Sequence, residues 1–159
     1  MKKLILLLLF IPLISFSQDL FFMGESCFNS TKSIVLASET YGENLTILFA
    51  NNADSKYIVA QRESILNYKF SGKLIIYLNN GDVISLLEPS ASDYVNKTST
   101  GMFALTNEVI DKLKKTNINS IAYTLKRFDF TEKFSAKNID FDSTQLLKQI
   151  KGFYKETPY

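Results

Sequence analysis

The segment KLIIYLNNGDVISLL, residues 73–87, decides the fold of this chain. Two apolar runs, 74–78 and 83–87, flank the turn sequence Asn79-Asn80-Gly81-Asp82. Asn-Gly between apolar runs is a strong hairpin signal, because both residues accept a positive φ. The segment therefore predicts two antiparallel strands joined by a tight turn.

Both faces of this hairpin carry apolar side chains. Leu74, Ile76 and Leu78 share one face of the first strand. Ile75 and Tyr77 share the other. A strand with one face in water alternates apolar and polar residues, so we expect the hairpin to lie mid-sheet, with a helix or a second sheet covering its other face. The alternative is that Ile75 and Tyr77 form a partner-binding surface.

Further strands are predicted on both sides of the hairpin. They are marked by short apolar or alternating runs, some of them next to a glycine that favours a turn. The predicted strands are residues 20–23, 34–40, 45–49, 57–61, 102–105 and 121–125. The stretch YIVAQRESILNY, residues 57–68, also fits a short helix.

Two helices are predicted in the C-terminal half. The first begins at Thr106 or Asn107 and ends in a lysine-rich turn that complements the helix dipole. The second begins at Asp142 or Ser143 and ends at Gly152.

These elements predict a single domain over residues 19–159. Its expected fold class is α+β, with a mostly antiparallel sheet of about six to eight strands and two helices packed on it.

Residues 1–18, MKKLILLLLFIPLISFSQ, have the layout of a cleaved secretory signal peptide. Two lysines precede an apolar run over residues 4–14, and Ser15 and Ser17 stand at the −3 and −1 positions of a cut before Gln18. We expect export to the periplasm or beyond, with no stable membrane anchor after cleavage. A retained anchor is the alternative, although the run is shorter than the ~20 apolar residues of a spanning helix.

Cys27 is the only cysteine, so the chain has no internal disulfide. A lone exported thiol is buried, reactive, or paired with another molecule. The neighbours of Cys27, residues 24–30, include Glu25 and no cation, whereas reactive thiolates lie in electropositive surroundings, and we expect burial. Lipidation of Cys27 is a further alternative, although Glu25 stands where a lipobox carries a small residue.

The composition excludes several function classes. The chain has no histidine, which removes Ser-His-Asp and Cys-His catalysis and His-ligated zinc. It has no GxGxxG or P-loop motif, and we expect no cofactor. The 18 basic residues exceed the 16 acidic ones by two, and Lys2 and Lys3 are the only charges in the leader. The mature chain is therefore balanced, and we expect no nucleic-acid partner.

A few aromatic residues are candidate contacts for a ligand. Tyr94 lies in the polar stretch 88–100, which we expect to be a long loop. Phe128 and Phe130 lie close to Lys126 and Arg127 and could stack on a sugar or a base. With 13 phenylalanines and no tryptophan in the chain, core filling is the preferred interpretation of the two phenylalanines.

The chain resembles small exported proteins of Bacteroidota-type bacteria. The resemblance rests on the MKKLILLL…SFSQ leader, on the Asn-, Lys-, Phe- and Ile-rich composition, and on IIYLNNGDVISL followed by FALTNEVIDKLKKTNINSIAYTL. It spans residues 1–18 and 73–125 and supplies no catalytic residues. The chain has no long C-terminal sorting domain, which favours the periplasm over surface attachment.

The leading hypothesis is a non-enzymatic exported domain that binds a protein, a glycan or another envelope component. One alternative is a His-free hydrolase that uses Asp129, Glu132, Asp140 or Asp142 as acid and base. Another is a thiol-dependent role for Cys27, either covalent dimerisation or redox exchange. The sequence does not specify the ligand or the oligomeric state.

Overall fold

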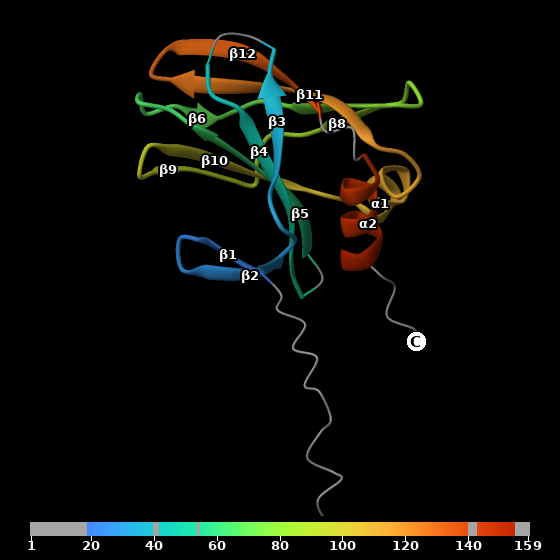
Figure 1. Ribbon diagram of the computed structural model, residues 1–159. Helices are drawn as coiled ribbons and strands as arrows, with labels where there is room; N and C mark the ends of the chain where they lie inside the picture. Colours follow the sequence, from blue (N-terminus) through green and yellow to red (C-terminus); the bar gives the residue numbers. More distant parts are fainter. Residues whose placement is uncertain (1–18, 40–41, 54, 140–142, 155–159) are drawn as a thin grey trace, which may run out of the picture.

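The computed structural model describes residues 19–39, 42–53, 55–139 and 143–154, which form twelve strands and two helices (Figure 1). The strands are β1 (Asp19–Met23), β2 (Ser26–Ser30), β3 (Ile34–Ser38), β4 (Leu45–Asn52), β5 (Ser55–Glu63), β6 (Lys69–Phe70), β7 (Leu74–Leu78), β8 (Val83–Leu86), β9 (Ala91–Val95), β10 (Thr98–Ala104), β11 (Ile118–Arg127) and β12 (Phe130–Lys137). The helices are α1 (Asn107–Leu113) and α2 (Ser143–Phe153).

The strands form one antiparallel sheet. Its main path runs β8-β7-β11-β12-β3-β4-β5-β10-β9. Two branches leave this path: β2 joins the β1–β2 hairpin to β4, and β6 pairs with β11. The link between the two halves is short in the described residues: Ser38 pairs with Ala136 and Ala37 with Lys137, and the Glu39 amide donates to the Ser135 carbonyl at 3.0 Å.

The predicted α+β class with about six to eight strands is wrong. The described residues are mostly β, and the helices are only 7 and 11 residues long. The missed strands are polar or largely solvent-facing, so they lack the apolar alternation that predicts a strand. The expected loop 88–100 instead contains β9 and the start of β10, joined by a turn in which Asn96 and Lys97 have φ of 50° and 63°.

The sheet curls around one main core. Side chains from both halves meet there: the Phe70 ring lies 6.2 Å from Phe103 of β10 and 5.5 Å from Tyr123 of β11, between ring centroids. The same core receives the buried stripes of both helices. Its largest fully buried side chains are those of Tyr123, Phe49, Phe103, Leu36, Leu45, Ile47, Ile58, Leu74, Ile76, Ile110, Leu113 and Ile118.

Gly101 in β10 permits the close approach of Phe70 to the sheet. A Cβ at this position would lie 2.5 Å from Phe70 Cβ and 2.6 Å from its Cγ. Only a glycine leaves room for this ring, which is almost fully buried.

A second, smaller core lies on the outer face of β4, β5 and β10. The β1–β2 hairpin covers it and places Phe21 and Phe28 inward, with their rings 6.0 Å apart. The other buried members are Leu48, Ala50, Val59 and Met102.

The hairpin predicted over residues 74–87 is present as β7 and β8. Its expected position mid-sheet is wrong, because β8 ends the strand path formed by the described residues. Tyr77 and Val83 are exposed, while Ile75 is half-buried. The two helices pack into the main core and leave the Tyr77 side uncovered.

The helix predictions are confirmed in position. Thr106 caps α1, and its side chain accepts a hydrogen bond from the Val109 amide at 3.3 Å. Gly152 does not end α2 as expected but lies inside it. Tyr154 follows α2 and donates to the carbonyl oxygens of Ala50 and Tyr57 at 3.3 and 3.0 Å. Among the described residues, neither helix has the length and apolar character needed to span a bilayer.

Candidate functional site

Three turns meet at one end of the molecule, and we call this region the loop end: residues 64–68, 95–97 and 127–130. The Ser64 amide donates to the Lys97 carbonyl at 2.7 Å, and the Tyr94 hydroxyl donates to the Ser64 carbonyl at 2.8 Å. The Tyr68 hydroxyl donates to Glu132 Oε1 at 2.8 Å. These bonds tie the three turns together, and Figure 1 shows the β9–β10 and β11–β12 turns on the same side.

Apolar side chains protrude from all three turns. Ile65 is 88 % exposed, Phe128 78 % and Phe130 74 %, and Leu66 and Val95 are also exposed. Single exposed apolar residues need no explanation, but several on adjoining turns form a surface suited to a partner.

Phe128 occupies a strained backbone position. Arg127 pairs with Phe130, so Phe128 and Asp129 are the two turn residues between β11 and β12. Phe128 has φ of 50°, a conformation that hairpin turns usually give to Gly or Asn. Holding another residue there costs about 1–3 kcal/mol. Because its ring is largely in water, burial of the ring does not offset this cost.

A cavity of about 330 Å³ opens beside this turn, and we call it the basic cavity. Lys69 and Lys126 lie directly opposite each other on β6 and β11. The Arg127 guanidinium lies 5.4 Å from the Phe128 ring centroid, and its buried Nε has no hydrogen-bond partner. The lining residues are Asn67, Lys69, Ser71, Lys126, Arg127 and Phe128.

The cations of the basic cavity have no acidic partners within the described part of the chain. The one ion pair there within 4.0 Å joins Lys112 and Glu108 of α1, at 3.2 Å. No carboxylate lines the basic cavity. Two lysines directly across a strand pair repel each other, and nothing else in the cavity neutralises them.

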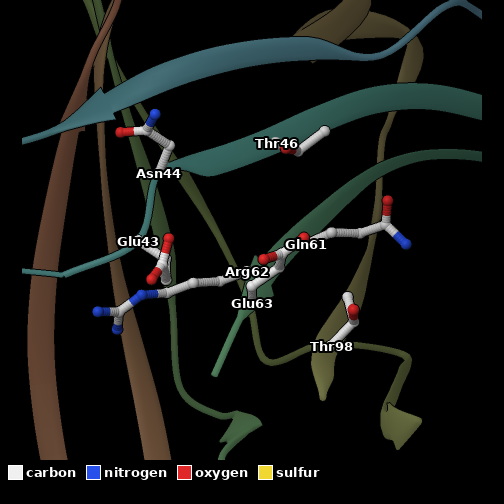
Figure 2. A pocket seen from close by; sticks show the side chains of 7 residues that line it. All are labelled: Glu43, Asn44, Thr46, Gln61, Arg62, Glu63 and Thr98. Carbon is white, nitrogen blue, oxygen red and sulfur yellow. The ribbon is translucent and has the colours of Figure 1, made fainter. Parts of the chain in front are cut away.

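A second cavity, of about 410 Å³, lies over β4 and β5 and is lined by polar residues of both charge signs (Figure 2). It includes Glu43 and Glu63, while the Arg62 side chain runs in the opposite direction from that of Gln61. Arg62 is only 8 % exposed, and its guanidinium carbon lies 3.9 Å from the Phe134 ring centroid. The cation is thus stabilised by stacking inside the fold, and the other charges that line this cavity are the carboxylates of Glu43 and Glu63.

Two tyrosines near Arg62 have perturbed acidity. Burial raises the pKa of Tyr123, and the nearby Arg62 charge partly opposes that shift. The hydrogen bond to Glu132 raises the pKa of Tyr68. Both groups are therefore neutral phenols at physiological pH, and neither has the lowered pKa of an activated nucleophile.

Three of the residues predicted as contacts come together at the loop end. Phe128 and Phe130 form its tip, and Tyr94 is half-buried and bonded to the neighbouring turn. The core-filling interpretation of the two phenylalanines is wrong, because the β11–β12 turn holds both in solvent. Ile75 and Tyr77 lie on β7, outside the loop end.

Cys27 is exposed, so the expectation of burial is wrong. It lies opposite Phe22 in the β1–β2 register. Because Phe28 and Phe21 face the second core, alternation along the two strands turns Cys27 and Phe22 outward. The predicted cleavage residues Ser17 and Gln18 lie outside the described residues.

Of the four carboxylates proposed for a hydrolase, the two that the structure describes lie outside both cavities. Asp129 and Glu132 are exposed and line neither cavity. Asp140 and Asp142 lie outside the described residues. Among the residues that are described, no three Cys, Asp or Glu side chains group as a metal site.

Several residues of the loop end and of the adjoining basic cavity were not predicted. Ile65, Leu66 and Lys69 lie between β5 and β7. The stretch 57–68, which includes Ile65 and Leu66, also fitted a short helix and so did not mark a turn. The available signal was the adjacent pair Ile65 and Leu66, which lies outside any alternating run and so does not belong to the buried face of a strand. Their proximity to Phe128 arises from the β6–β11 pairing, which is not a local pattern.

Comparison with known proteins finds no matching family model, no similar curated protein and no similar solved structure. The candidate site therefore rests on the geometry of the loop end alone.

Proposed function

We propose that this protein is an exported, non-enzymatic binding domain that contacts an envelope component through its loop end. The observation that carries the proposal is Phe128, a large aromatic residue that combines a positive φ with a largely exposed side chain. Glycine at this position would relieve the backbone strain. A residue that costs stability and fills no core is typical of a functional position.

The surroundings of Phe128 have the composition of a binding surface. Phe130 and Ile65 provide further apolar anchors from different turns, and Lys126 and Arg127 provide a polar rim. Binding energy in interfaces concentrates in aromatic and arginine residues at such a centre. The hydrogen bonds among the turns hold the anchors in place before binding, which lowers the entropic cost of association.

Export is supported by the leader over residues 1–18. N-terminal sequencing of protein produced from the full-length sequence in its natural compartment should begin at Gln18. Recovery of the intact N-terminus from the cytoplasm would contradict export.

Binding is tested with Phe128→Gly. The variant should be as stable as the wild type or more stable, because strain is removed, and should bind isolated cell envelopes at least tenfold more weakly in co-sedimentation. Val83→Ser, which truncates an exposed apolar residue on β8, is the matched control and should bind as the wild type does. Equal binding by all three proteins, or no binding by the wild type, would refute the role of the loop end.

A further inference from the structure

We infer that the basic cavity binds a carboxylate-bearing sugar unit of an acidic glycan. This inference rests on the proposed function, since it names the ligand class of the same loop end.

The first argument is electrostatic. Lys69 and Lys126 are directly opposed across the β6–β11 pair, and no carboxylate lines the cavity. Like charges at such a position destabilise the strand pair. An anion placed between the two ammonium groups removes the repulsion and gains two charge-assisted hydrogen bonds.

The second argument concerns the geometry of Arg127. Its side chain is half-buried, with a buried Nε that has no hydrogen-bond partner. Guanidinium donors form a planar fork that matches the two oxygens of a carboxylate. Because the group is already partly withdrawn from water, an incoming carboxylate meets a cation whose desolvation cost has been partly met by folding.

The third argument separates a sugar from other anions. Asn67 and Ser71 add an amide and a hydroxyl to the lining, and Phe128 adds an aromatic ring. A uronic acid has hydroxyls for the first two, a carbon–hydrogen face for the ring and a carboxylate for the cations. The volume of about 330 Å³ is near the lower end of the ~300–1,000 Å³ range of small-molecule sites, which suits a single sugar unit.

Nucleic acid is a poorer match to the same cavity. A nucleic-acid surface extends over several phosphates and gives the domain an excess of basic residues. Here three cations, Lys69, Lys126 and Arg127, line one small cavity, and the mature chain has equal numbers of acidic and basic residues.

The test measures binding of oligogalacturonate and of its methyl ester by isothermal titration calorimetry. The two probes share the sugar framework and differ in the carboxylate charge. We expect the acid to bind and the ester to bind at least tenfold more weakly, with affinity for the acid falling as salt rises. Equal binding of the two probes, or no binding of either, would overturn the inference.

Variants test the assigned residues. Lys126→Glu places opposite charges across from each other, so the fold is retained while affinity for oligogalacturonate falls at least tenfold. The double variant Lys32→Ala/Lys137→Ala removes two exposed lysines that line neither cavity, and should bind as the wild type does. An equal loss of affinity in both variants would show that binding depends on net charge and not on the basic cavity, and would overturn the inference.

Poly-glutamate separates a glycan site from an acidic-peptide site. Binding of poly-glutamate as strong as that of oligogalacturonate would overturn the sugar assignment. The two proposals fail separately: if Phe128→Gly loses envelope binding but oligogalacturonate does not bind, the loop end functions with a different ligand.

Discussion

Replacing Gly101 by alanine should destabilise the fold sharply. The added methyl group would lie 2.5 Å from Phe70 Cβ and 2.6 Å from Phe70 Cγ. Carbon atoms are in favourable contact at about 3.5–4.0 Å, so the chain must separate by about 1 Å. The atoms that clash belong to the stem of the Phe70 side chain, which cannot swing away as a flexible tip can.

The neighbours of Phe70 set the magnitude. Its ring is held between Phe103 and Tyr123, so relief of the clash displaces the centre of the main core. Overpacking of this kind costs about 1–3 kcal/mol. For a domain of this size the melting temperature should fall by roughly 2–4 °C for each kcal/mol.

Gly152→Ala is the matched comparison. A Cβ there meets nothing within 4 Å, and the residue lies inside α2. Alanine is favoured over glycine in a helix by about 1 kcal/mol. Both substitutions restrict the unfolded chain equally, so a difference between them reports on the folded state: the clash with Phe70 at residue 101 and the helix preference of alanine at residue 152.

Urea unfolding followed by circular dichroism measures both variants. We expect Gly101→Ala to unfold at lower urea than the wild type, and Gly152→Ala at equal or higher urea. If Gly101→Ala is as stable as Gly152→Ala, Phe70 does not pack against β10 as described.

Two further predictions concern buried polar groups. Thr31→Val should lower the free energy of unfolding by about 1–3 kcal/mol, because the buried Phe49 amide loses its acceptor at 3.0 Å; Thr31→Ser, which keeps the hydroxyl, should lose much less, and equal losses in urea unfolding would contradict the role of this bond. Burial raises the pKa of Tyr154 and of Tyr123 above the ordinary value near 10. The folded state therefore holds these protons more tightly, and the stability they contribute below pH 10 is lost as the pH rises above it. Tyr154→Phe should cost about 1 kcal/mol at pH 7 through its lost hydrogen bonds and should show a shallower alkaline decline; an unchanged decline in urea titrations at pH 7 and pH 11 would contradict the assignment.

The parts of the fold with local signals were predicted from the sequence. The β7–β8 turn contains Gly81, whose φ of 90° glycine adopts readily, and the flanking strands are apolar. The cap of α1 at Thr106 is likewise a local hydrogen bond. The β9–β10 turn was missed because Lys97 adopts a positive φ, a conformation its residue type does not indicate.

The candidate site was predicted only in part. Phe128, Phe130 and Tyr94 were identified by residue type. Their proximity depends on the pairings β9–β10, β5–β10 and β11–β12, which position the turns of the loop end. The opposition of Lys69 and Lys126 is also a matter of register between distant strands. No pattern within a short window of sequence encodes such pairings. Local residue preferences predicted a loop over residues 88–100 and core positions for Phe128 and Phe130, and both predictions were wrong.

The short β3–β12 link has a consequence for how the chain folds. The sheet becomes continuous only when Ala136 reaches Ser38, and Tyr154 then bonds to a strand 104 residues earlier in the sequence. Contacts of such long sequence separation slow folding, because loop closure precedes the gain from packing. The native state thus forms only after nearly all of the chain is present.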